Sequence, residues 1–282
     1  MEEKKNAYFF IEHITKSEEY FYFFFPILER IIRNYNKEKD LNALKLLCTI
    51  VERAKNNNFK ITEDILKNYK YKKEDLLVFN DVFGPLTENC LSFTKEQINV
   101  IFIDKVIDLK LYGEKYFNSA NIYIGFDNEW FKKFRCKEKN ETAIMQLSDY
   151  DGKNILILDM INLPKDNNFI NVFKEIFIDK KIIGFDINKD LTNLPNDIMT
   201  HLQEKNEIIE LINIYKIVKF ETPIYFFEVC KELFDKPLCT IEEFSDWERR
   251  PLRQSQLHYA ALNAIYCCLV FKKLFELKDK FK

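Results

Sequence analysis

Apolar and polar residues follow a helical spacing over the first part of the chain. The segment Leu41–Lys55 places apolar side chains three and four residues apart, which predicts an amphipathic helix. The segment Thr94–Leu109 opens with Thr94 three residues before Gln97, the arrangement of a capping box, and predicts another helix. Residues 1–117 are therefore predicted to form an all-α N-terminal domain.

The pattern changes at residue 118, where short runs rich in β-branched residues replace the helical stripes. A turn at Tyr150–Gly152 between two of these runs predicts a β-hairpin. The predicted strands are Ile122–Glu129, Thr142–Leu147, Ile155–Asp159 and Lys181–Gly184, with helices over Asn168–Phe177 and from about Lys189 onward. Strands followed by a helix, a strand and more helices predict an α/β domain over residues 118–282.

The composition is that of a folded chain without a strong overall charge. Of the 282 residues, 47% are apolar and 31% are charged, so a substantial core can form. The 43 basic and 45 acidic residues give a net charge of −2, so binding to nucleic acid would require a local basic patch. The seven cysteines include no CxxC pair, and the charged N-terminus lacks the apolar segment of a signal peptide. We expect a soluble intracellular protein, of the nucleus or the cytoplasm, with no membrane partner.

Three short motifs carry polar side chains that could act together. Asp127 and Glu129 occupy alternate positions of a predicted strand, so they project from the same face. Asp190 lies where a helix is predicted to begin after a strand. Tyr259 and Asn263 are four residues apart and share one face of an alanine-rich helical segment.

Each motif taken alone has a structural explanation. An acid pair on a strand is usually solvated, and an acid at the start of a helix is favoured by the helix dipole. An alanine-rich helix with two polar residues is typical of a core helix. The order and the local spacing of the three motifs together favour a functional site.

Together the motifs resemble those of the DEDDy 3′–5′ exonucleases, the superfamily of RNase D and the Werner-syndrome exonuclease. The branch that the chain resembles most is the Nibbler-like one, because the block Ser245–Gln256 (SDWERRPLRQSQ) runs directly into the helix of Tyr259. The resemblance covers roughly residues 118–275. It implies an RNase H-like exonuclease domain, a mixed sheet flanked by helices, preceded by the all-α N-terminal domain.

The resemblance also implies a reaction and roles for individual residues. In that superfamily two divalent cations, Mg²⁺ or Mn²⁺, promote hydrolysis of the phosphodiester bond at a 3′ end. Asp127 and Glu129 would be metal ligands, and Asp190 would support the second ion. Tyr259 would orient the attacking water, since a phenol with a pKa near 10 is a poor base at neutral pH. The implied partner is single-stranded nucleic acid, RNA rather than DNA, and no protein partner is indicated.

The chain departs from the motif at Asn263, where the superfamily has a fourth acid. An amide oxygen can coordinate a hard cation, but it brings no negative charge. Asn263 is therefore expected to be a catalytic-site metal ligand that binds more weakly than an acid. The alternative is a weakened or inactive pseudo-exonuclease that binds nucleic acid or acts as a scaffold. A nearby acid such as Asp186 could also substitute for the missing one.

Arg249, Arg250 and Arg253 form a local basic cluster just before the third motif. Because arginine suits bidentate contact with phosphate, these three residues are predicted to bind nucleic acid. Ion pairs and capping contacts within the fold are the alternative. Trp130 and Trp247 could each stack on a base, although a tryptophan is more often a core residue.

Overall fold

The computed structural model describes residues 90–93, 97–118, 122–130, 141–223, 225–252 and 254–279. The helix predicted over Leu41–Lys55 lies outside these residues, so helical structure in that part of the predicted N-terminal domain stays a prediction. The described residues belong to two compact units, with residues 241–255 in one and the remainder in the other. The two units are described separately, and the larger one holds the sheet.

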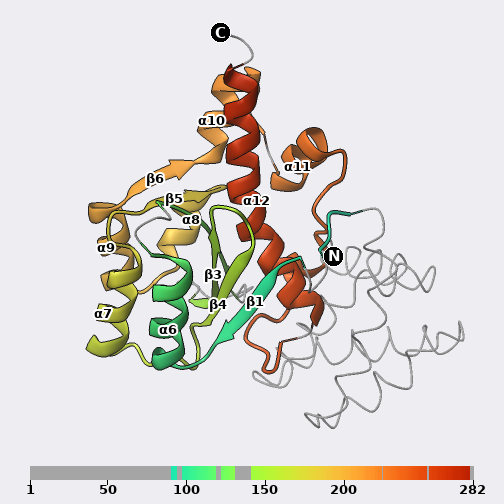
Figure 1. The fold of residues 1–282 in the computed structure, drawn as a ribbon. Coiled ribbons are helices and arrows are strands. Elements are labelled where there is room, and N and C mark those ends of the chain that lie inside the picture. Colours follow the sequence, from blue (N-terminus) through green and yellow to red (C-terminus); the bar gives the residue numbers. More distant parts are fainter. Residues whose placement is uncertain are drawn as a thin grey trace, which may run out of the picture. The chain divides into compact units, whose positions relative to one another are not determined.

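The larger unit is built on a six-stranded sheet with helices on both faces (Figure 1). Its strands are β1 (Asn99–Ile103), β2 (Tyr123–Trp130), β3 (Thr142–Asp149), β4 (Asn154–Asp159), β5 (Lys181–Gly184) and β6 (Glu207–Glu210). Its helices are α6 (Val106–Tyr116), α7 (Asn167–Ile176), α8 (Ile187–Thr192), α9 (Asn196–Lys205), α10 (Leu211–Lys219), α11 (Phe226–Phe234) and α12 (Gln254–Asp279). The smaller unit includes the first two residues of α12 and the short 3₁₀ helix η3 (Ile241–Phe244).

The strands lie in the order β1-β4-β3-β2-β5-β6. Strand β3 is antiparallel to β2 and β4, and the other neighbouring pairs are parallel. The hairpin predicted at Tyr150–Gly152 joins β3 to β4, and Gly152 has a φ of 69°, a left-handed conformation that favours glycine. This mixed sheet flanked by helices confirms the predicted fold class, and β2 to β5 and α7 lie where the sequence predicted strands and a helix.

Two predictions about secondary structure are wrong. The segment predicted as a helix over Thr94–Leu109 contains β1, which pairs in parallel with β4, and α6 begins only at Val106. The run Asn99–Ile103 (NVIFI) is rich in β-branched residues, and pairing with a neighbouring strand outweighs the local capping signal. Strand β6 was not predicted, because it has only four residues and lies at the sheet edge beside β5.

Helices α6, α7 and α9 lie side by side against one face of the sheet (Figure 1). Helix α7 illustrates why they form there. The Asp166 side chain accepts a hydrogen bond of 2.9 Å from the Phe169 backbone amide and caps the helix. Buried Phe169 and Phe173 then repeat at helical spacing and pack into the core. Helix α12 packs against the opposite face of the sheet.

Helix α12 approaches the sheet closely at Gly125 in β2. A Cβ atom added to Gly125 would lie 2.2 Å from the Ala264 carbonyl oxygen and 2.9 Å from the Cys268 sulfur. Ala260 and Ala264 are fully buried, as expected for an alanine-rich helix that packs against a strand. The small residues on both elements set the distance between α12 and the strand that carries Asp127.

We predict that Gly125→Ala destabilises the fold by about 3 kcal/mol, because its new methyl group meets a backbone carbonyl that cannot move alone. Gly113→Ala in α6 is the matched control. Its Cβ would also be crowded, at 2.7 Å, but by the end of the flexible Ile176 side chain. Alanine also favours a helix, so this variant should stay within about 1 kcal/mol of wild type. Chemical denaturation of both variants would measure the difference, and equal losses would contradict the explanation.

Candidate active site

Strand β2 brings Asp127 and Glu129 to one face of the sheet. It lies between β3 and β5, and it pairs with β5 over Tyr123–Gly125 and with β3 over Ile124–Trp130. Glu129 is buried, and the Oδ2 atom of Asp127 is buried without a hydrogen-bond partner. The register of β2 against β3 shifts between Glu129 and Trp130, so the regular pairing ends immediately after the two acids.

Asp190 reaches the same region from α8. The Glu210 carboxylate accepts hydrogen bonds of 3.0 Å from the backbone amides of Asp186 and Ile187, and it holds the start of α8 against the end of β6. Asp186 has a φ of 55° there, and its own side chain is largely exposed, 4.0 Å from the Lys189 ammonium. Asp190 follows one turn later and is only 6% exposed. Asp190 is therefore not a solvated acid of the kind that usually favours the start of a helix.

Two buried side chains that the sequence analysis did not single out fix α8 to the sheet. The Asn128 Nδ2 atom donates to the Asp190 carbonyl oxygen at 2.9 Å and to the Thr142 hydroxyl at 3.4 Å. The Thr142 hydroxyl donates to the Asn193 carbonyl oxygen at 3.0 Å. Asn128 lies between the two acids of β2. The sequence signal that could have identified it is a polar residue in the middle of a strand.

Helix α12 carries the third motif across the sheet. The Asn263 Nδ2 atom donates to the Glu129 Oε1 atom at 3.4 Å. Tyr259 lies one helical turn before Asn263 on the same face, and both side chains are partly exposed. Three elements that are distant in the sequence, β2, α8 and α12, therefore bring the predicted acids and Asn263 together.

The pKa shifts of the two aspartates reflect their burial and their polar neighbours. Burial raises the pKa of Asp127 to about 7, although hydrogen bonds from Asn263, the Asn128 amide and Asp190 partly offset that effect. Burial and the neighbouring charge of Asp127 also raise the pKa of Asp190 well above its usual range. Two adjacent buried carboxyl groups cannot both ionise without a compensating positive charge. The pair therefore holds a proton to a higher pH than isolated carboxyl groups would.

The donor set has the chemistry of a hard-cation site. All the groups that converge offer oxygen, from carboxylates and one amide, and Mg²⁺ and Mn²⁺ prefer such ligands. The buried Oδ2 atom of Asp127, which has no hydrogen-bond partner, fits a ligand position. Within the part of the chain that the structure describes, no group of three or more His, Cys, Asp and Glu side chains is arranged to hold a metal ion.

The predicted nucleic-acid-binding arginines lie in the smaller unit. Arg249 is buried, and its Nη1 atom donates to the Pro251 carbonyl oxygen at 2.7 Å. Arg250 is partly exposed and donates from Nη1 to the carbonyl oxygens of Trp247 and Arg249. Arg253 lies outside the described residues. These contacts agree with the alternative of capping within the fold, without testing whether the arginines also bind phosphate.

The two tryptophans differ in their surroundings. Trp247 is fully buried, as a core residue is. Trp130 is partly exposed, and the Lys189 ammonium lies 5.9 Å from the centre of its ring. Trp130 therefore lies next to Glu129 in sequence and next to the helix of Asp190 in space.

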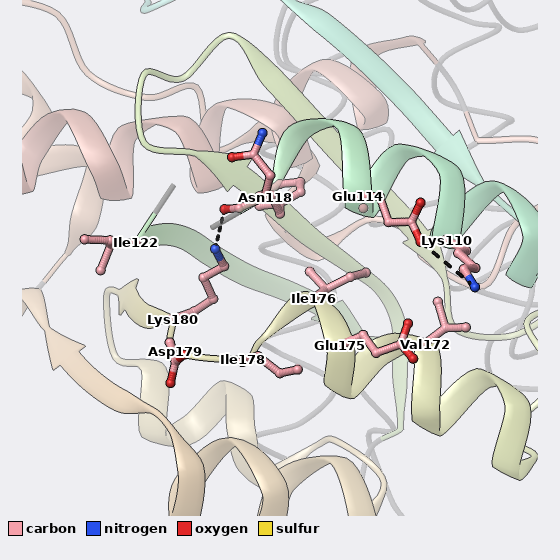
Figure 2. A pocket seen from close by; sticks show the side chains of 12 residues that line it. Lys110, Glu114, Asn118, Ile122, Val172, Glu175, Ile176, Ile178, Asp179 and Lys180 are labelled. Carbon is pink, nitrogen blue, oxygen red and sulfur yellow. Dashed lines mark hydrogen bonds and ion pairs between the residues drawn. The ribbon is translucent and has the colours of Figure 1, made fainter. Parts of the chain in front are cut away.

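A separate cavity of about 580 Å³ lies between α6 and the end of α7 (Figure 2). The Lys180 ammonium donates to the Asn118 carbonyl oxygen at 2.6 Å on one side of it, and Lys110 pairs with Glu114 at 4.0 Å on the other. None of the described candidate site residues lines this cavity. The described helices also include none that is long and apolar enough to cross a membrane.

Comparisons with known proteins agree with this arrangement. A family model described as 3′–5′ exonuclease matches residues 100–277. Exonuclease mut-7 of Caenorhabditis elegans is 24% identical over 185 residues, which is 57% of this chain and 20% of that protein. The exonuclease mut-7 homolog of Aedes aegypti is 28% identical over 165 residues, 52% of this chain and 22% of that protein. The chain thus spans about a fifth of the length of these relatives.

Solved structures show the same fold. The Nibbler EXO domain of Aedes aegypti has a TM-score of 0.57 and 19% identity, covering 68% of this chain and 94% of that one. RNase D of Escherichia coli has a TM-score of 0.54 and 18% identity, covering 65% of this chain and 46% of that one. The chain belongs to the 3′–5′ exonuclease family. Within that family it has the DEDD-type, RNase D-like domain that the motifs predicted.

The raised pKa of Asp127 predicts a specific pH dependence of stability. An unfolded aspartate has a pKa near 3.9. Between that pH and about 7 the folded state binds more protons than the unfolded state, so stability falls as pH rises. In EDTA, the melting temperature of the wild type should therefore decrease from pH 5 to pH 8. Asp127→Asn should show a smaller decrease, and it should be the more stable protein at pH 8.

Thermal melts of both proteins across this pH range would check the prediction. Asp151→Asn is the matched control, because Asp151 is an exposed acid bonded to Lys272, and its pKa is lowered by that contact. This control should keep the decrease of the wild type. Parallel pH profiles for wild type and Asp127→Asn would contradict the assignment.

Proposed function

We propose that this domain removes nucleotides one at a time from the 3′ end of single-stranded RNA, with two divalent cations as cofactors. The observation that carries the proposal is the convergence of Asp127, Asp190, Glu129 and Asn263 from three separate elements. Membership of the 3′–5′ exonuclease family supports the reaction class.

In this proposal Asp127 and Asp190 would hold Mg²⁺ or Mn²⁺, whose positive charge would compensate the two carboxylates. Glu129 and the Asn263 amide oxygen complete the ligand set. Bound cations of this kind stabilise the charge that develops on the attacking and leaving oxygens of a phosphodiester. Tyr259, one turn before Asn263, orients the attacking water through its hydroxyl. Each role is the one carried over from the motif to the residue in this chain.

RNA is the proposed substrate because of the relatives. The Escherichia coli RNase D structure is described as an exoribonuclease involved in structured RNA processing. Arg249, Arg250 and Arg253 are proposed to contact the phosphate backbone. Of the two that are described, Arg250 is the better candidate, since Arg249 is only 5% exposed. A basic cluster of this kind would make binding salt-dependent.

One observation favours a second candidate function, a pseudo-exonuclease that binds RNA without cutting it. The Asn263 amide turns its donor atom, not its oxygen, toward Glu129. An amide in this orientation satisfies a carboxylate in place of a cation. Such a site would bind metal weakly and would retain the strand without hydrolysing it.

The nuclease proposal predicts that the full chain shortens a 5′-labelled single-stranded RNA in single-nucleotide steps with Mn²⁺ or Mg²⁺, and that EDTA stops the reaction. Asp127→Ala should lower the rate at least about a hundredfold, which corresponds to about 2.7 kcal/mol of barrier. Asp151→Asn, an exposed acid in the β3–β4 turn, should keep the wild-type rate. An RNA that stays intact throughout a Mn²⁺ titration would refute the proposal.

The Asn263→Asp variant distinguishes the two candidate functions. It adds a negative charge beside Glu129, so it should bind Mn²⁺ more tightly and cleave at least about tenfold faster than the wild type. Without metal it should melt at a lower temperature, because like charges then repel. If the wild type is inert and the variant cleaves, the pseudo-exonuclease is correct. If both cleave equally, the fourth charge does not limit the reaction.

A further inference from the structure

Helix α8, which carries Asp190, is too short to hold its own position. It has six residues, Ile187–Thr192, and an isolated helix of that length is not stable in water. Its N-cap residue, Asp186, makes no side-chain capping hydrogen bond, so the first backbone amides need acceptors from elsewhere in the fold. A residue that supplies such acceptors helps to fix the position of Asp190.

Glu210 supplies these acceptors from the end of β6. Its Oε1 atom accepts a hydrogen bond of 3.0 Å from the Asp186 amide, and its Oε2 atom accepts one of 3.0 Å from the Ile187 amide. Asp186 has a φ of 55°, and two successive amides at such a left-handed turn can form a concave anion-binding nest. The Glu210 carboxylate therefore occupies an anion site that the backbone makes at the start of α8.

The same carboxylate also caps the next helix along the chain. Helix α10 begins directly after β6, and the Glu210 Oε1 atom accepts a hydrogen bond of 3.2 Å from the Ile212 amide. One side chain thus serves three amides from two helices, with both of its oxygens as acceptors. Glutamine has a single acceptor oxygen and an amide nitrogen that donates. In the same position it would present a donor to the amide of Asp186 or to that of Ile187.

An N-cap for α10 would need only one of the two oxygens of Glu210. The second oxygen, Oε2, accepts from α8. Burial raises the pKa of Glu210, and the three amide hydrogen bonds counteract that rise. The charge of Glu210 in turn contributes to the raised pKa of Asp190. An acid this close to other acids is unfavourable for packing alone, and its hydrogen bonds to α8 offset that cost.

We propose that Glu210 is a positioning residue that sets where Asp190 lies relative to Asp127. It holds the start of α8 from β6, while Asn128 in β2 holds the Asp190 carbonyl oxygen at 2.9 Å. Both contacts tie α8 to the same sheet. Glu210 touches neither substrate nor cation, and it acts through the backbone of α8. Its role in metal binding rests on the nuclease function proposed above, whereas its role in holding α8 does not.

Amide hydrogen exchange of the full chain tests the contact without reference to activity. It is measured by NMR at pH 7 in EDTA for wild type, Glu210→Gln and Glu207→Gln. In Glu210→Gln the amide of Asp186 or that of Ile187 should exchange at least about tenfold faster, because one of the two has lost its acceptor. Unchanged protection of both amides would overturn the proposal.

Two controls show whether the effect is local. Glu207→Gln makes the same substitution on the same strand, but Glu207 is largely exposed and pairs with Lys181 at 2.7 Å, so this variant should exchange as wild type does. The amide of buried Ile183, in the strand that pairs with β6, should keep its wild-type protection in Glu210→Gln. An equal loss of protection at Ile183 would indicate global destabilisation and would contradict the proposal.

A Mn²⁺ titration tests the role in the candidate active site. Glu210→Gln should bind Mn²⁺ about tenfold more weakly and lower kcat on labelled RNA with little change in KM, because Asp190 is displaced while the RNA surface is intact. Glu207→Gln should match wild type in each measurement. Unchanged Mn²⁺ affinity in Glu210→Gln would overturn the positioning role.

A second variant separates position from charge. Asn128→Leu removes the other contact with α8 and leaves the net charge unchanged, so it should also weaken Mn²⁺ binding. If only Glu210→Gln weakened binding, the lost charge would be responsible and the positioning role would be wrong.

Failure of this proposal is distinguishable from failure of the nuclease function. A wild type that binds no Mn²⁺ and cuts no RNA would refute the proposed nuclease function, while hydrogen exchange would still decide whether Glu210 holds α8. Faster exchange together with weakened Mn²⁺ binding in both variants supports the contact and its role.

Discussion

Two adjacent buried carboxyl groups require either a proton or a cation between them. Asp127 and Asp190 are in this position: burial raises the pKa of both, and the charge of Asp127 raises that of Asp190 further. A site of this kind is disfavoured as long as no positive charge is present, because burying charge without a partner is costly. The surrounding fold therefore has to hold the two acids together against their repulsion.

Two sets of contacts hold the acids from different sides. Helix α12 packs on β2 through Gly125 and Ala264, so Asn263 can reach Glu129. Asn128 ties the backbone of Asp190 to the strand at 2.9 Å. Asn263 and the backbone amide of Asn128 also hydrogen-bond to the side chain of Asp127, so that carboxylate is the shared centre. The rigid strand β2 is the common support of both.

The sequence was sufficient for the central strands and for the identity of the converging acids. Side chains of a strand alternate between its two faces, so Asp127 and Glu129 share one face of β2 independently of tertiary contacts. Strand β1 was predicted as a helix because its pairing with β4 is a tertiary contact between segments far apart in the chain. Local signals such as the Thr94–Gln97 capping box carry no information about such a partner.

The supporting polar residues could not be predicted for a related reason. Asn128 and Thr142 are isolated polar positions in strands, and their importance depends on which atoms lie beside them. Asn128 becomes informative only through the position of α8, and Thr142 only through its hydrogen bond to the Asn193 carbonyl oxygen. A linear pattern identifies groups that act at regular spacing, whereas these residues act across the sheet.

The replacement of an acid by Asn263 changes the metal-free state as well as the metal-bound one. An amide has a donor side and an acceptor side, and the donor side faces Glu129. Presenting the oxygen to a cation requires the amide to turn over and to give up that hydrogen bond. An aspartate would have no such hydrogen bond to lose, and it would instead be repelled by Glu129 until a cation arrived. Asn263 therefore supports the metal-free site through this hydrogen bond, which the proposed metal-binding role would require it to give up.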